Sequence, residues 1–267
     1  MKLLRSHLLK RGSALVLFVL AGMVSGRGAA RSCLTPDPNT CKIPEDCFYK
    51  RQIAMKRALR DSFASSALRC KALENARRQL GPNASDADVN KRAAELLYDD
   101  IANNPGRIAR RLPRCNTSLA DPPGWETAAD CSFSAKGADG KWIDPESVNT
   151  CSEFMKAARD HERVHVAACK AARDGRKLDL GATSGWVPHG NACAGANYNN
   201  GDPKVPDRDS LNDFADEEAD AYTEEIWRLE DERAAAIRAC TTAREAAKAA
   251  ANASKNAKAL SGMKGAR

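Results

Sequence analysis

Apolar residues recur at three- and four-residue steps in four stretches of this chain, which is the pattern of helices that bury one face. The clearest stretch spans residues 151–173, and its core-facing stripe includes two histidines and a glutamate beside apolar side chains. The other helices are expected over about 48–80, over 85–103, and from 209 or 210 to beyond 240. The first two should pack as a helical hairpin, so the pattern predicts a mainly α fold.

Glycine, proline and capping residues mark where these helices should begin and end. Gly81 and Pro82 should stop the first helix, and Ser85 can cap the start of the second. Gly175 suits the end of the helix over 151–173 because glycine readily adopts the left-handed conformation of a helix C-terminus.

The remaining segments lack helical periodicity. Prolines and glycines interrupt 104–149, within which 131–135 and 141–144 resemble the two strands of a small β-hairpin. The glycine- and asparagine-rich loop over 178–209 is long, and loops of this length are usually functional or disordered. The alanine- and lysine-rich tail from 244 has little to bury and should be a frayed helix or disordered.

Composition indicates an exported protein. Residues 1–30 combine a basic start, a short apolar run over 14–24 and small residues at 28–30, which is typical of a cleavable signal peptide. All ten cysteines follow this segment, so we expect a disulfide framework of five bridges whose pairing the sequence leaves open. The predicted location is secreted or periplasmic.

The net charge argues against a nucleic-acid-binding domain. The whole chain carries +7, and the signal holds five basic residues and no acids, so +7 minus 5 leaves +2 for the mature protein. A domain that binds nucleic acid specifically would begin from a basic footprint, so we expect no specific nucleic-acid partner. No second long apolar run follows the signal, and we expect no transmembrane segment in the mature protein.

The helix over 151–173 carries the motif of greatest chemical interest, His161-Glu162-Arg163-Val164-His165. Side chains four apart stack on one face of a helix, so both imidazoles can reach a single ion. Glu162 follows the first histidine and could deprotonate a water at that ion, whereas Arg163 should face solvent. The spacing therefore predicts a zinc site with a general base.

A catalytic zinc needs a third protein ligand and an open position. At 100° per residue Glu218 falls within about 40° of the apolar stripe of the last helix, whereas Asp216 and Glu217 point off it. A buried carboxylate must be paired, protonated or bound to metal, because an unpaired buried charge is costly. Glu218 is thus the expected third ligand.

With Glu218 placed 53 residues after His165, the sequence resembles the gluzincin branch of the zincin metallopeptidases over about 151–230. The resemblance implies His161, His165 and Glu218 as Zn²⁺ ligands and Glu162 as general base. Gluzincins often carry an aspartate four residues after the ligand glutamate, where this chain has Tyr222, so Asp216 and Glu217 stay open as ligands. Tyr222 or His189 could stabilise a developing oxyanion.

Other interpretations of these residues remain open. His161 and His165 could be ordinary core or surface histidines, and a closed structural zinc site could include Cys169. Glu218 could be a hydrogen-bonded buried carboxylate, and Glu225 on the same stripe could pair with a basic neighbour. The basic tail could bind anionic envelope or nucleic-acid surfaces, although such tails are usually solvated ends.

Together these observations predict a disulfide-stapled helical domain with a small β-hairpin and a zincin-like active-site helix. We divide the chain into a signal over 1–30, a helical part over 31–110, a metallopeptidase-like core over 111–243 and a basic tail over 244–267. The expected function is a zinc-dependent hydrolase acting on a peptide or protein substrate. The alternative is a non-catalytic helical binding or scaffold protein of the cell envelope, with or without zinc. The sequence does not indicate an oligomeric state.

Overall fold

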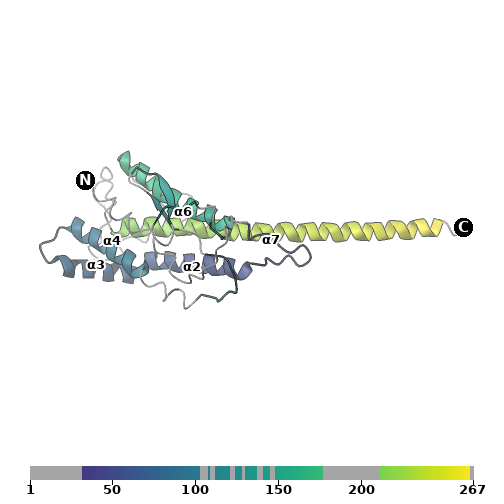
Figure 1. Cartoon of the computed structure of the whole chain (residues 1–267), viewed down its shortest axis with the longest axis horizontal. Coiled ribbons are helices and arrows are strands. Elements are labelled where there is room, and N and C mark those ends of the chain that lie inside the picture. The colour runs from purple at the N-terminus through teal and green to yellow at the C-terminus, as the bar shows by residue number, and fades with distance from the viewer. Residues whose placement is uncertain are drawn as a thin grey trace.

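The structure is a computed structural model that describes residues 32–102, 108, 112–120, 124–127, 130–136, 141–144, 148–176 and 211–264. The predicted signal peptide and the whole of the predicted 178–209 loop lie outside these residues. The described part is mainly helical, as predicted (Figure 1). Its elements are α2 (Asp46–Ala64), α3 (Ser66–Leu80), α4 (Asp86–Ala102), β1 (Gly124–Thr127), β2 (Phe133–Lys136), α6 (Ser152–Arg173) and α7 (Leu211–Lys264).

The first half of α7 is the centre of the molecule. α2 and α6 pack along it, α4 and α3 also contact it, and α3 pairs with α4 as the predicted helical hairpin (Figure 1). Every residue of α7 before Trp227 is therefore buried or half-buried, and polar side chains here must find partners inside the protein.

The predicted single helix over 48–80 is in fact two helices. The chain leaves the helical conformation at Ser65, where ψ is 111°, and the Ser65 hydroxyl accepts a hydrogen bond from the Leu68 N–H at 3.4 Å. Serine competes for backbone donors in this way, which makes it a good first residue for a new helix and a poor interior one. The expectation of continuity was wrong because the apolar spacing persists across the break.

The other helix ends agree with prediction. Gly81 follows α3 with φ of 83°, and Ser85 accepts from the Asp88 N–H at 3.1 Å at the start of α4. After α6, Gly175 adopts φ of 68°, and the Arg176 N–H donates to the Ala171 carbonyl at 2.8 Å. Such a left-handed glycine satisfies carbonyls that the last helical turn leaves without partners.

α7 continues unbroken through the predicted tail to Lys264 and projects from the body as a single helix (Figure 1). Of the two states expected for the tail, helix is the one observed. From 245 to 256 its side chains are all exposed, so its helicity follows from a sequence rich in alanine and lysine.

The predicted strand over 131–135 exists as β2, but its main partner is different. β2 pairs antiparallel with the upstream strand β1, with Trp125 opposite Ala135 and Thr127 opposite Phe133. The predicted partner over 141–144 contributes one hydrogen bond, from the Ile143 N–H to the Ala135 carbonyl at 3.2 Å. β1 was missed because four residues are too few for alternation to be recognised.

The apolar core forms three clusters that follow this arrangement. One joins α2, α3 and α4 to the start of α7, and a second joins the N-terminal segment and α2 to α6 and to α7 further along. The third places Trp125 and Ala135 of the strands against Met155 and Ala158 of α6. The small sheet is thereby fixed on the helix that carries the histidine motif.

Disulfides link the elements, as the cysteine count predicts. The described pairs are Cys33–Cys151, Cys41–Cys240, Cys47–Cys115 and Cys131–Cys169. Cys70 is also disulfide-bonded, whereas Cys193 lies outside the described residues. Bridges of this number indicate an oxidising compartment. Among the described helices, none is long and apolar enough to cross a membrane.

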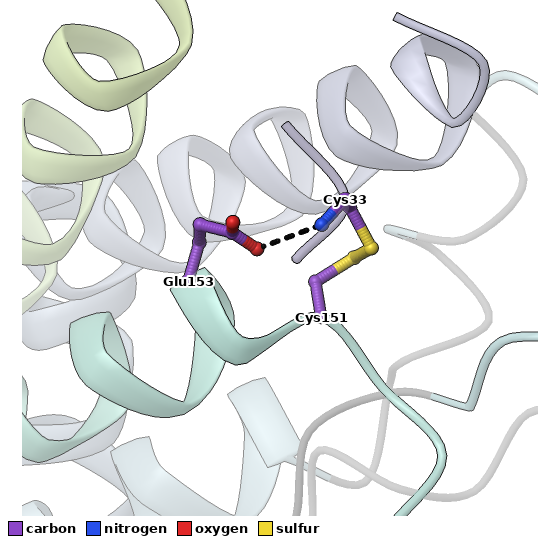
Figure 2. Close-up of side chains that lie close together, drawn as sticks. All are labelled: Cys33, Cys151 and Glu153. Carbon is purple, nitrogen blue, oxygen red and sulfur yellow. Dashed lines mark hydrogen bonds between the residues drawn. A yellow bond between two sulfur atoms is a disulfide. The ribbon is translucent and has the colours of Figure 1, made fainter. Parts of the chain in front are cut away.

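Figure 2 shows the bridge at the start of α6, where Glu153 also accepts a hydrogen bond from the Cys33 N–H at 3.1 Å. Cys33, Cys151 and Glu153 lie close enough together to resemble a metal site. A thiolate is needed to bind metal, and both sulfurs are consumed by the disulfide. This cluster therefore anchors the N-terminal segment to α6.

Candidate metal centre

α6 presents His161 and His165 side by side toward α7. Their Nε2 atoms lie 3.2 Å apart, and the two rings meet edge to face with centroids 5.0 Å apart. The arrangement follows from the helix itself, because residues four apart lie one turn above each other. The Nε2 atoms of the two rings thus point toward the same position.

α7 supplies a carboxylate to the same place. Glu218 Oε2 lies 3.9 Å from His161 Nε2, and Glu218 Oε1 lies 3.7 Å from His165 Nε2. Tetrahedral zinc with bonds of about 2.0–2.1 Å holds its nitrogen and oxygen ligands about 3.4 Å apart. The three side chains therefore stand within about 0.5 Å of the spacing that zinc requires, and two imidazoles with one carboxylate are a donor set that suits it.

Each histidine has a further carboxylate at its other ring nitrogen. His165 Nδ1 lies 2.9 Å from Glu217 Oε1, and His161 Nδ1 lies 3.5 Å from Glu225 Oε2. Metal-binding histidines almost always direct their second nitrogen to such a group, which keeps the proton on Nδ1 and the Nε2 lone pair turned toward the metal. The shorter contact is a hydrogen bond, and the longer one is a weaker polar contact.

Glu225 also has the basic neighbour that its position on the stripe suggested. Lys56 of α2 lies 3.0 Å from Glu225 Oε1, and both side chains are buried. Burial raises the pKa of Glu225, but Lys56 and His161 outweigh burial and hold that pKa below its usual value. Glu225 thus stays charged beside His161.

Glu162 lies near His165 and Glu218 and is held by a hydrogen bond from the small sheet. The hydroxyl of Thr127, the last residue of β1, donates to Glu162 Oε2 at 2.8 Å. Thr127 is 2% exposed and Glu162 is 8% exposed. No sequence pattern singles out Thr127, because the contact joins a strand to a helix 35 residues further along the chain.

Two tyrosines complete the surroundings. The Tyr222 ring lies 4.5 Å from the His161 ring, and burial together with Glu218 and Glu225 raises the pKa of Tyr222 well above its usual value. Burial and the charges of Glu218 and Glu162 likewise raise the pKa of Tyr98 of α4. Both phenols are therefore protonated at neutral pH. Tyr98 was not foreseen, since one tyrosine in an amphipathic helix carries no functional signal.

The site holds more negative than positive charge. Glu162, Glu217, Glu218 and Glu225 surround the histidine pair, and Lys56 is the described cation paired among them. When both imidazoles are neutral, as metal binding requires, −4 plus 1 leaves −3. Burial raises the pKa of Glu218, the histidines lower it, and Glu162 and Glu217 raise it further. A divalent cation would offset much of this repulsion.

The two residues left open beside Glu218 have other places. Asp216 is completely buried and accepts from Arg69 Nη2 at 2.7 Å, so its carboxylate is engaged away from the histidines. Glu217 reaches His165, but at Nδ1 and not at the shared Nε2 position. Asp216 and Glu217 were both expected to point off the stripe. In the structure other helices pack around α7 on several sides, so positions off this stripe also have partners: Arg69 for Asp216 and His165 for Glu217.

Three other residues considered in the sequence are Cys169, Arg163 and His189. Cys169 is bridged to Cys131 and has no thiolate to offer, so the closed site that included it is excluded. Arg163 is exposed, as expected, and pairs with Asp160. His189 lies outside the described residues.

In the metal-free protein, stability is expected to fall as pH rises toward 10. Burial alone would lower the pKa of His165, but Glu218, Glu217 and Glu162 raise it to about 10. The unfolded value is about 6.5, so the stabilisation is complete below that pH and is lost as pH rises through 10. Urea unfolding of chelator-treated protein at pH 6, 8 and 10 measures the loss. A His165→Gln variant should show a flatter pH dependence over this interval, and equal slopes would contradict the assignment.

Comparison with protein-family models, with curated proteins and with solved structures finds no match for this chain.

Proposed function

We propose that this protein is an exported zinc-dependent hydrolase of the metallopeptidase type, which cleaves peptide bonds with a metal-activated water. One observation carries the proposal: His161, His165 and Glu218 bring their ligand atoms within 4.8 Å of one another, with His161 buried and the other two half-buried, beside the carboxylate of Glu162. The carboxylates behind both histidines add support, because glutamates in these positions orient imidazoles for metal. Catalysis also requires that only three protein ligands bind, which this donor set satisfies.

His161, His165 and Glu218 would hold the zinc, which when bound supplies Lewis acidity toward a carbonyl oxygen and lowers the pKa of a water. Glu162 takes the proton from the attacking water and returns it to the nitrogen of the leaving amine. The protonated phenol of Tyr222 donates a hydrogen bond to the oxygen that gains negative charge. Tyr222 can act as this donor because burial and the neighbouring carboxylates keep its proton in place.

Replacing Glu162 by glutamine is expected to abolish peptide cleavage while leaving about one zinc per chain. Glutamine keeps the size of the side chain but cannot accept a proton, and a general base typically contributes about 10²–10⁴-fold to the rate. Elemental analysis gives the zinc content, and mass spectrometry of a mixed peptide library gives cleavage. Glu230→Gln is the matched control, since Glu230 lies on α7 in an exposed pair with Arg57.

The second candidate is a zinc-binding protein without catalysis, such as an adaptor or inhibitor. Burial favours it, because His161 and Glu162 are each only 8% exposed and a substrate must reach both. Zinc at one per chain with no cleavage by the unmodified protein would select this candidate. If protein purified without chelators and then incubated with zinc holds none, both zinc-dependent candidates are rejected, and a metal-free helical scaffold is left.

A further inference from the structure

We propose that Thr127 is a positioning residue for Glu162: its hydroxyl holds Oε2 of the carboxylate and so directs proton transfer to Oε1. The inference rests on the proposed function and names a residue outside the histidine motif. Its basis is the hydrogen bond from Thr127 Oγ1 to Glu162 Oε2 at 2.8 Å, which is buried and joins two separate elements.

The register of the small sheet places Thr127 at this point. Side chains alternate along a strand, so Trp125 and Thr127 lie on the same face of β1. Trp125 packs against Met155 and Ala158 of α6, and Glu162 lies one turn beyond Ala158 on the same helix. The apolar contact of Trp125 with α6 thus fixes the position along the helix at which the Thr127 hydroxyl contacts the Glu162 carboxylate.

The strand gives the hydroxyl a fixed direction. Thr127 pairs with Phe133 across the sheet, and it is 2% exposed. Threonine is branched at Cβ and has few rotamers, so a buried threonine in a strand keeps its hydroxyl in place. The Cys131–Cys169 bridge ties the chain just before β2 to α6 near its end and holds the sheet on this helix.

The hydrogen bond suits both states of a general base. With Glu162 ionised, the Thr127 O–H donates to Oε2 and leaves Oε1 to accept the proton of the attacking water. As the O–H bond of water breaks, that proton moves to Oε1, and Oε2 becomes the carbonyl oxygen that still accepts from Thr127. The proton then passes from Oε1 to the leaving nitrogen, and the hydrogen of Thr127 never leaves Oγ1.

The test compares Thr127→Val, which keeps the shape and removes the hydroxyl, with Thr127→Ser, which keeps the hydroxyl. Cobalt-loaded protein is titrated with acetohydroxamate, whose hydroxyl proton must pass to a nearby base as it chelates the metal, and visible absorption reports binding. The values of kcat and KM are measured on a peptide cleaved by the unmodified protein. Thermal unfolding of each variant shows whether it is folded, and Thr127→Ala replaces the valine variant if that variant is unfolded.

Thr127→Val is expected to bind cobalt as the unmodified protein does. It should bind acetohydroxamate about tenfold more weakly and lose about tenfold or more in kcat with little change in KM, because a hydrogen bond to a charged group is lost. Thr127→Ser should recover most of both losses. Equal behaviour of the valine variant and the unmodified protein would overturn the inference, as would a serine variant as defective as valine. If the unmodified protein binds neither cobalt nor acetohydroxamate, the proposed function itself fails and the inference falls with it.

Discussion

Replacing Glu218 by glutamine is expected to lower zinc affinity by more than about 100-fold. Loss of a group that merely orients a ligand typically costs 10–100-fold, and Glu218 is proposed to bind the metal directly. Glutamine has nearly the same shape, but its amide oxygen carries no charge to offset that of the ion. The carboxylate stands 3.7 and 3.9 Å from the two Nε2 atoms, so no other described side chain is needed to complete the site. Competition with a chromophoric chelator measures the affinity.

Two further glutamates on α7 serve as controls for this prediction. Glu217→Gln should give an intermediate loss, because Glu217 touches His165 only at Nδ1. Glu230→Gln should leave the affinity unchanged, since Glu230 lies away from the histidines in an exposed pair. If Glu217→Gln loses more affinity than Glu218→Gln, Glu217 is the ligand and the assignment of Glu218 is wrong.

Replacing Asp216 by asparagine is expected to destabilise the protein by about 3–5 kcal/mol, the largest effect on stability that we anticipate. Arg69 and Asp216 are both completely buried, and their 2.7 Å contact joins the start of α3 to the first turns of α7. Arg69 also donates to the Phe63 carbonyl at 2.7 Å and to the Asn212 side chain at 3.2 Å. Asparagine would leave the guanidinium charge in the interior without its counter-charge. The free energy of unfolding in urea, measured with saturating zinc, checks the effect.

The pair itself contributes less than its disruption suggests. An Arg69→Met, Asp216→Leu double variant should be more stable than Asp216→Asn alone, because it removes both charges together. The exposed pair of Glu74 and Arg78 on α3 is the matched comparison, and Arg78→Met should cost no more than about 0.5 kcal/mol. A loss below about 1 kcal/mol for Asp216→Asn would contradict the argument. Retained zinc in that variant would place Asp216 outside the metal site.

The sequence was most informative where a structural feature depends on neighbouring residues alone. Gly81, Ser85 and Gly175 mark helix ends through their own backbone and side-chain preferences, so each could be read without a fold. The meeting of His161 and His165 is equally local, because one helical turn brings them together. The break at Ser65 is also local but was missed, since apolar spacing continues across it and hides the cap.

Glu218 is an intermediate case. Periodicity could place its carboxylate on the core-facing stripe of the last helix, because that depends only on positions within one helix. Whether this stripe faces the histidines, at a distance that a metal can bridge, depends on how α6 packs against α7. The structure shows this packing, and it also shows that Asp216 contacts Arg69 and that Glu217 contacts His165 at Nδ1.

By itself the sequence determined the mainly helical class, the histidine pair and the expectation of disulfides. Only the tertiary structure decided the disulfide pairing, the partner of β2, and the groups that surround the site from α2, α4 and β1, namely Lys56, Tyr98 and Thr127. The physical reason is sequence separation. Periodicity and capping act over a few residues, whereas a contact such as that of Lys56 with Glu225 exists only once distant segments have packed around the same buried charge.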